Sequence, residues 1–243
     1  FHETYYRPNR TILSVVGDIR PADFRQRLLA RLGGWQAGGP EVQGPPAPAG
    51  LDRRTVKTIQ RDVVQANVFL GHLGITRDNP DFYAVQVMNY ILGGGGLTSR
   101  LVAKVREEKG WAYDVGSVFL ADKYAGSFSL SLQTRNENAD EAIAAVLSEI
   151  RRIRDQPVSA AELSDAKAYL TGSFPLRMDT NGKIARLLVS IEYFGLGLDY
   201  PERYPELINR VTLADVQRVA RKYLHPEAYA LVAVADLRKA RIQ

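Results

Sequence analysis

The chain has 243 residues, of which 45% are apolar and 24% are charged, a composition that is ordinary for a globular protein. Its net charge of +5 comes from 32 basic and 27 acidic residues without a run of five like charges, which gives a nucleic-acid-binding function little support. Cysteine is absent, so disulfides and thiolate metal sites are excluded, and no apolar stretch reaches the ~18 residues of a membrane-spanning helix.

The chain opens with one strand pattern and one helix pattern. Residues 11–17 form a short β-branched apolar run, which predicts a strand. Pro21 then begins an amphipathic stretch with Phe24 and Leu28 at helical spacing, and Gly33 and its neighbouring glycine end it. A chain that starts without methionine and enters a strand pattern almost at once is expected to be a fragment or a processed chain.

A linker is predicted next. Residues 37–52 contain four glycines and four prolines, a density that neither a helix nor a sheet tolerates. We therefore place a domain boundary there, with a strand and helix at 1–36 before it and a larger domain at 53–243 after it.

The larger domain alternates strand and helix patterns. Strand patterns lie at 55–76, 112–121, 126–134 and 228–236. Helix patterns lie at 79–92, 99–110, 137–155, 180–194, 201–209 and 212–224, and a further helix is predicted to begin at Ser159. In the stretch 126–134, Phe128, Leu130 and Leu132 alternate with polar residues and are expected to face a core, and this strand is a candidate edge of the sheet. The order predicts an α+β fold: a mixed or antiparallel sheet with helices on one face, in two layers.

Three segments together resemble one family. They are YYRPNRTILSVVGDI at 5–19, GGGGLTSRLVAKVREEKGWAYDVGSVF at 93–119 and VTLADVQRVARKYLHPEAYALVAVAD at 211–236. The combination resembles the insulinase (pitrilysin-type) zinc peptidases, in particular the metal-free second half-domain of bacterial processing-peptidase-like members. The glycine-rich turn at 93–96 lacks the Gly-Lys-Ser/Thr of a phosphate-binding loop, so we interpret it as a helix stop.

The resemblance implies paired half-domains of similar fold that enclose an unfolded peptide like a clam-shell. Residues 1–36 would be the tail of the zinc-bearing half, 37–52 the linker and 53–243 the complete half without a metal. The implied function is to bind peptide substrate for a zinc-dependent peptidase while being inert alone. The implied partner is a zinc-bearing half-domain or subunit, in a homo- or heterodimer, with neither nucleic acid nor membrane involved. The alternative is a non-catalytic structural or assembly subunit of the same fold, and the compartment, bacterial periplasm or cytoplasm, stays open.

The family's zinc motif, His-x-x-Glu-His, is absent from this sequence. The three histidines are His2, His72 and His225, and no two of them lie within five residues of each other. Zinc is therefore expected in the other half-domain or in a partner subunit, not in this chain. We interpret His72, which lies among apolar residues of a strand pattern, as a core or edge histidine.

Two residues are candidates for substrate binding. Arg106 lies in the last turn of a predicted helix, and Tyr113 follows seven residues later at the start of a strand. A helix-turn-strand corner of this length can bring both side chains to one edge of the sheet. The resemblance implies that such a pair binds substrate main chain and supports the oxyanion, for which a guanidinium and a phenol are suited donors. The alternative is that Arg106 is a solvated helix residue and Tyr113 an ordinary strand residue, with Ser99 and Arg100 as capping and turn contacts.

Overall fold

The computed structural model describes residues 1–40 and 42–242. Glu41 of the predicted linker and Gln243 at the end of the predicted larger domain lie outside the described residues. The chain forms two compact units: Phe1–Pro46 with Thr171–Pro205, and Ala47–Leu170 with Glu206–Gln243. No described helix is long and apolar enough to cross a membrane.

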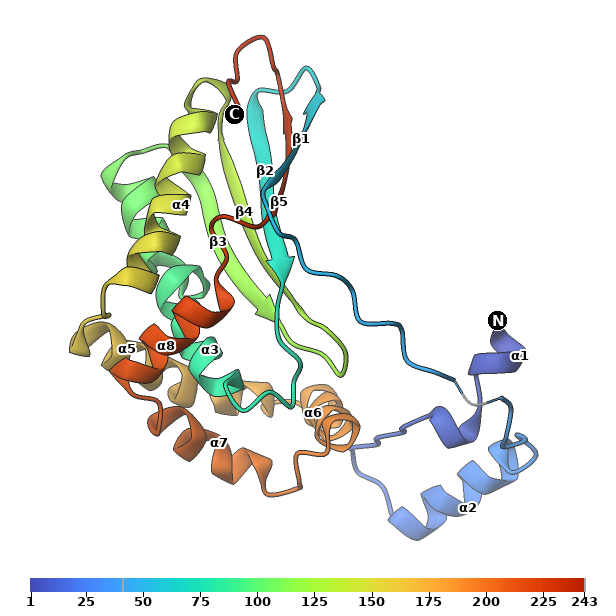
Figure 1. Cartoon of the computed structure of the whole chain (residues 1–243). Helices are drawn as coiled ribbons and strands as arrows, with labels where there is room; N and C mark the ends of the chain where they lie inside the picture. Colours follow the sequence, from blue (N-terminus) through green and yellow to red (C-terminus); the bar gives the residue numbers. More distant parts are fainter. Residues whose placement is uncertain (41, 243) are drawn as a thin grey trace. The chain divides into compact units, whose positions relative to one another are not determined.

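The second unit is built on one five-stranded sheet with the strand order β1-β5-β2-β4-β3 (Figure 1). The strands are β1 (Thr55–Gln60), β2 (Gln65–Leu73), β3 (Ala112–Leu120), β4 (Ser127–Arg135) and β5 (Ala230–Ala235). β1 and β5 run parallel, whereas β2 pairs antiparallel with β4 and β5, and β3 pairs antiparallel with β4. The sheet is therefore mixed, as the sequence predicted.

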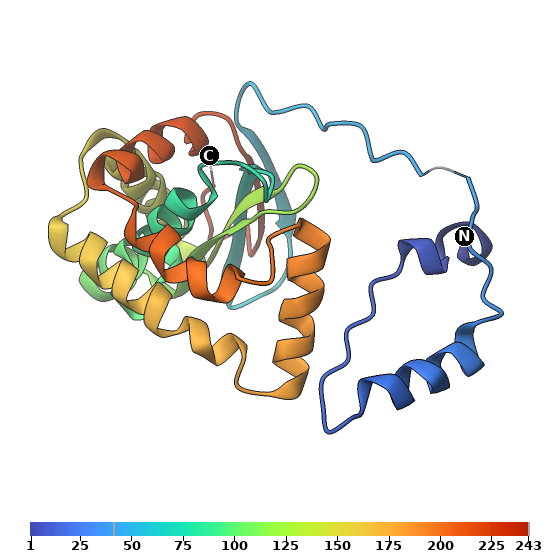
Figure 2. The same cartoon turned by 90° about the horizontal axis from the view of Figure 1, so that it is seen from below.

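One face of the sheet is buried under helices. Phe128, Leu130 and Leu132 of β4 point into the core as their alternation predicted, and Leu70 of β2 and Leu231 of β5 join them. The covering helices include α3 (Phe82–Asn89), α4 (Ala139–Asp155) and α8 (Leu213–Tyr223), which lie on the same side of the sheet in both views (Figure 1 and Figure 2). The opposite face is open, and the two-layer α+β prediction is confirmed.

Local signals set the helix boundaries. α5 (Ala160–Gly172) begins with a capping box in which the Ser159 amide donates to Glu162 and the Glu162 amide donates to the Ser159 hydroxyl. Thr212 and Asp215 form the same box at α8. The predicted helices at 180–194 and 201–209 are observed as α6 (Asn181–Phe194) and α7 (Tyr200–Asn209).

The first unit confirms the predicted helix but not the predicted strand. α2 (Pro21–Leu32) has Pro21 in its first turn and Gly33 at its end, and a short helix α1 (His2–Tyr5) precedes it. Residues 11–16 form no strand, although Thr11 has extended backbone angles. The strand prediction is wrong for this chain because a strand needs a hydrogen-bonded neighbour, and none pairs with these residues in the described part of the chain.

Two further predictions about strands need correction. The stretch 55–76 is not one long strand but β1 and β2, which the turn at 61–64 separates and between which β5 inserts. The stretch 126–134, which was a candidate edge of the sheet, is not an edge strand. β4 lies inside the sheet between β2 and β3, and the edges are β1 and β3.

Candidate functional site

Arg106 and Tyr113 lie together at a corner of the sheet. Arg106 belongs to a π-helical segment, Val102–Glu108, and Tyr113 is the second residue of the edge strand β3. Between them the chain turns at Gly110, whose φ of +63° lies in the left-handed region that favours glycine. The Arg106 guanidinium carbon is 6.0 Å from the centre of the Tyr113 ring, and Tyr113 is 70% exposed. The sequence prediction that this corner brings the two side chains to one edge therefore agrees with the geometry.

A β-bulge aims Tyr113 and its neighbour at the same side of the sheet. Ala112 pairs with Thr134 and Asp114 pairs with Gln133, so Tyr113 is the extra residue. Ala112 and Val115 are both buried, at 7% and 4% exposure, while Tyr113 and Asp114 are both exposed. Without the bulge, strict alternation would place Tyr113 and Asp114 on opposite faces.

Asp114 was not predicted as a site residue from the sequence. The signal was the spacing in Ala-Tyr-Asp-Val, where two core residues stand three apart instead of two. Such a break in strand periodicity marks a bulge, and bulges are over-represented next to active sites. The open face of β3 thus begins with an aromatic residue and a carboxylate side by side.

A groove of about 430 Å³ runs over the open face beside these residues. Its floor is made of small residues, Gly116 of β3 with Ser129 and Ser131 of β4. Phe69 of β2 and Val118 of β3, which are 59% and 41% exposed, stand above that floor. Gly116 pairs with Ser131 across the sheet, and Ser131 pairs with Phe69. These three residues therefore form one cross-strand row, in which Gly116 and Ser131 belong to the floor and Phe69 forms one wall.

The glycine-rich turn borders the groove at the edge of β3. A Cβ on Gly93 would lie 2.5 Å from the Ser117 hydroxyl oxygen and 2.7 Å from the Ser117 amide nitrogen, so only glycine fits there. The Asn89 side-chain amide donates to the Ser117 carbonyl oxygen at 3.1 Å, and the Ser117 hydroxyl donates to Asn89 Oδ1 at 2.8 Å. These contacts cover the middle of the edge strand and leave its Tyr113 end uncovered by this turn.

The helical segment that carries Arg106 is anchored by an ion pair. Arg100 donates from Nε and Nη2 to the two carboxylate oxygens of Glu162 in α5, at 2.6 and 2.9 Å. The Arg100 side chain is 10% exposed, and its hydrogen bonds to Glu162 lower the pKa of that carboxyl to about 2. Arg100 was predicted to make a turn contact, but it ties the start of this segment to a separate helix.

His72 and His225 have structural roles. The rings of His72 and His225 lie 4.9 Å apart, but both His72 nitrogens are engaged: Nδ1 lies 2.8 Å from the Leu73 carbonyl oxygen, and Nε2 accepts from the His225 amide. His72 also stacks on Phe128, and burial lowers its pKa to about 4. Among the described residues, no group of three or more His, Cys, Asp or Glu side chains is placed to hold a metal.

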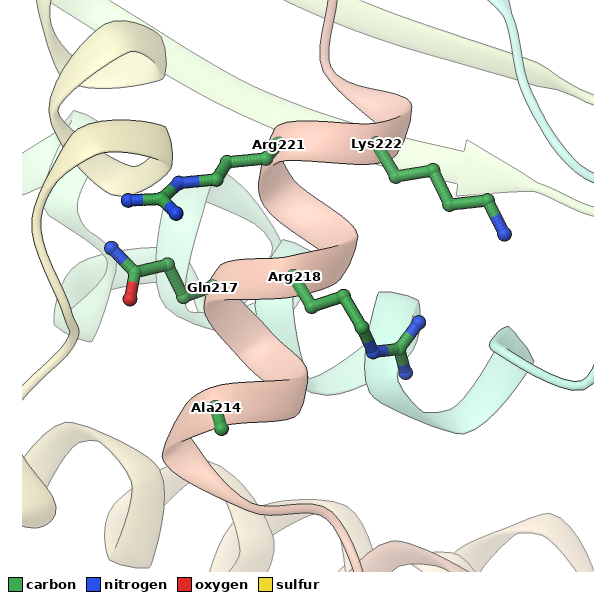
Figure 3. A pocket seen from close by; sticks show the side chains of 5 residues that line it. All are labelled: Ala214, Gln217, Arg218, Arg221 and Lys222. Atoms are coloured by element: carbon green, nitrogen blue, oxygen red, sulfur yellow. The ribbon is translucent and has the colours of Figure 1, made fainter.

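A second hollow, of about 400 Å³, lies along α8 and is less suited to a ligand (Figure 3). All its lining side chains come from one helix: Ala214, Gln217, Arg218, Arg221 and Lys222. Arg218 and Lys222 form ion pairs with Asp81 at 2.7 and 3.1 Å, and Arg221 donates to the Arg154 carbonyl oxygen. Burial alone would raise the pKa of Asp81, but its hydrogen bonds with Tyr223, Arg218 and Lys222 hold it below the ordinary value. These charges hold α8 in place.

Comparison with known proteins identifies the family. Residues 1–170 match the family model described as the peptidase M16 inactive domain. The chain belongs to this family. It is 30% identical over 240 residues to the "uncharacterized zinc protease YmxG" of Bacillus subtilis, covering 95% of this chain and 55% of that protein. It is 29% identical over 230 residues to the "non-peptidase homolog YmxG" of Helicobacter pylori, covering 94% of this chain and 51% of that protein.

A solved structure agrees with the sequence matches. The peptidase M16 inactive domain from Pseudomonas fluorescens superposes with a TM-score of 0.80 at 29% identity, over 93% of this chain and 53% of that one. The resemblance to insulinase-type zinc peptidases is thereby confirmed. The chain spans about half the length of the curated relatives that it matches.

Proposed function

We propose that this chain is the peptide-binding, metal-free half of a zinc-dependent peptidase that acts on unfolded peptides in a closed chamber. The observation that carries the proposal is the pairing of Arg106 with Tyr113 at the bulged end of an edge strand, on the open side of the sheet. Both side chains are exposed, so a substrate can reach them. Edge strands also offer main-chain groups to which an extended peptide can add.

The chemistry of the pair suits peptide hydrolysis. Attack on a peptide bond places negative charge on the carbonyl oxygen, and a positioned donor that binds this oxygen contributes about 3 kcal/mol of transition-state stabilisation. The Arg106 guanidinium supplies a permanent charge with several N–H donors, and the Tyr113 phenol supplies one O–H donor. The described residues offer no ligand set for zinc, so the metal would be held by another half-domain or a partner subunit.

We also propose that residues 1–36 belong structurally to the zinc-bearing half. The segment LSVVGDIRPA at 13–22 matches LVAVADLRKA at 231–240, which contains most of β5 and the turn after it. The identical pairs are Leu13 and Leu231, Val16 and Val234, Asp18 and Asp236, Arg20 and Arg238, and Ala22 and Ala240. By this match, 13–17 would be the counterpart of β5 in a second sheet of the same kind.

The exposed apolar side chains of this segment support that assignment. Ile12, Leu13, Val15, Leu29 and Leu32 are each at least 39% exposed, and a segment of this kind is stabilised by covering such a face. Residues 37–52 would then be the linker between two half-domains of similar fold, and residues 53–243 would be the second half-domain.

Steady-state kinetics of the assembled enzyme on a long unfolded peptide test the proposal. Arg106→Ala should lower kcat/KM by roughly a hundredfold or more, the scale of losing one oxyanion donor, and Tyr113→Phe should lower it less. Because both donors act on one substrate, the double variant should lose less than the product of the single effects. Circular dichroism and zinc content should stay unchanged. Near wild-type cleavage by both single variants would refute the proposal.

The second candidate function is a non-catalytic structural or assembly subunit. It is favoured by one observation: a relative that is 29% identical has "non-peptidase homolog" as its name. This alternative predicts that the assembled protein cleaves no unfolded peptide and that Arg106→Ala leaves assembly unchanged. Cleavage of such a peptide that is lost on removal of zinc and weakened by Arg106→Ala would exclude it.

A further inference from the structure

The groove on the open face carries a single charge. Among the described residues that line it, Asp114 is the only one with an ionisable side chain, and the others are glycines, serines, Phe69, Val115, Val118 and Leu130. Asp114 is exposed and forms no ion pair with any residue in the described part of the chain. An otherwise neutral groove therefore contains one carboxylate that lacks a cation.

Strand register places this carboxylate at one end of the groove. On β3, Asp114, Gly116 and Val118 follow each other at alternate positions and so face the same side. Gly116, about 7 Å along the strand from Asp114, has no side chain, so nothing on this face of β3 stands between the carboxylate and Val118, which is about 13 Å from Asp114. Ser131 lies opposite Gly116, so the gap continues onto β4.

This arrangement matches the two parts of a basic side chain. Lysine and arginine lay their methylene stems along apolar surface and keep the charged end at a polar partner. Here the stem would lie over Gly116 and Ser131, between the exposed faces of Phe69 and Val118, and the charged end would reach Asp114. An acidic side chain in the same place would be repelled.

We propose that this groove is a subsite for a lysine or arginine side chain of a bound extended peptide, and that Asp114 determines this preference. The inference rests on the proposed peptide-binding function and adds a substrate class to it. Tyr113 immediately precedes Asp114, and the bulge turns both toward the open side. The subsite would therefore bind a peptide side chain that lies close to the main-chain segment bound by Arg106 and Tyr113. A free peptide amino terminus has the same charge, but it lacks a stem to fill the space between Phe69 and Val118.

Peptide binding to the 243-residue chain, followed through amide chemical shifts in NMR, tests the proposal. The probes are N-acetylated, alanine- and serine-based decapeptides that differ at one central position: arginine, citrulline, norleucine or glutamate. The proteins are the wild type, Asp114→Asn, Asp114→Lys and a matched control, Glu141→Gln. Glu141 is an exposed carboxylate on α4, which covers the other face of the sheet. A fifth probe is the citrulline peptide with a free amino terminus.

The wild type should bind the arginine peptide about three- to fivefold more tightly than the citrulline peptide, with shifts at Gly116, Ser129 and Ser131. Asp114→Asn should abolish this preference, Asp114→Lys should favour the glutamate peptide, and Glu141→Gln should behave as wild type. Equal binding of all acetylated peptides would overturn the subsite and leave the proposed function standing. Tighter binding of the free-amino peptide than of the arginine peptide would assign Asp114 to the amino terminus instead. If no peptide binds, the peptide-binding function fails, and the subsite fails with it.

Discussion

Replacing Glu162 by glutamine tests how the segment that carries Arg106 is held in place. The pKa of Glu162 falls from its ordinary value of 4.5 to about 2 in the folded chain, mainly because Arg100 donates two hydrogen bonds to it. A shift of this size corresponds to at most about 3 kcal/mol. The Glu162 side chain is still 32% exposed, so solvent screening reduces the expected loss in the free energy of unfolding to about 1–2 kcal/mol at pH 7. Glutamine keeps the carbonyl oxygen that caps α5 at Ser159.

The pH dependence separates this ion pair from a simple packing effect. Because the folded-state pKa is the lower one, the stabilisation is complete above about pH 4.5 and is lost as the pH falls toward 2. Urea unfolding should therefore show a wild-type advantage over Glu162→Gln that shrinks to roughly half or less of its pH 7 value by pH 3. Glu108→Gln, which removes the exposed partner of Lys104, is the control and should not change the midpoint measurably. A pH-independent difference, or none at pH 7, would refute the reasoning.

Two further substitutions test other parts of the same unit. The pKa of His72 is lowered to about 4, so the unfolded chain takes up a proton at a higher pH than the folded chain does, and wild-type stability should fall as the pH drops from about 6.5 to 4. In His72→Gln, the free energy of unfolding measured in urea should depend less on pH in this range. An unchanged pH dependence would contradict the assignment. Gly93→Ala would force a methyl group against Ser117 and should lower the free energy of unfolding, measured in urea, by about 1–3 kcal/mol. The control is Gly182→Ala in α6, where a Cβ would meet nothing within 4 Å, and it should be neutral or stabilising. Equal effects of the two substitutions would exclude the steric explanation.

The elements that could be predicted from the sequence are those with local causes. The alternation of Phe128, Leu130 and Leu132 marks β4 because a strand turns every second side chain to the same face. The capping boxes at Ser159 and Thr212 mark helix starts because a side chain satisfies amides within the first turn. The proximity of Arg106 and Tyr113 could also be predicted, because only one tight turn separates them in the chain.

The features that could not be predicted depend on residues far apart in the chain. The sheet order follows from the parallel pairing of β1 with β5, about 175 residues later, and no local pattern in 55–60 specifies that partner. For the same reason the sequence offered 126–134 only as a candidate edge and did not show that β3, at 112–120, is an edge strand. The strand expected at 11–17 has the right residues, but a strand forms only where a neighbour pairs with it. Asp114 was missed because a one-residue bulge changed which face it occupies.

Photo-crosslinking tests the central claim, that the Tyr113 corner of the open sheet face holds a peptide. Tyr113 would be replaced by p-benzoylphenylalanine, and a long unfolded peptide would be irradiated with the chain, alone and together with a zinc-bearing half. The matched control is the same replacement at Tyr124, which is also exposed but lies in the loop at the other end of the β3–β4 hairpin. We predict a saturable crosslink from position 113 that unlabelled peptide competes away, and only background from position 124. Equal crosslinking from both positions, or none from position 113, would contradict the account.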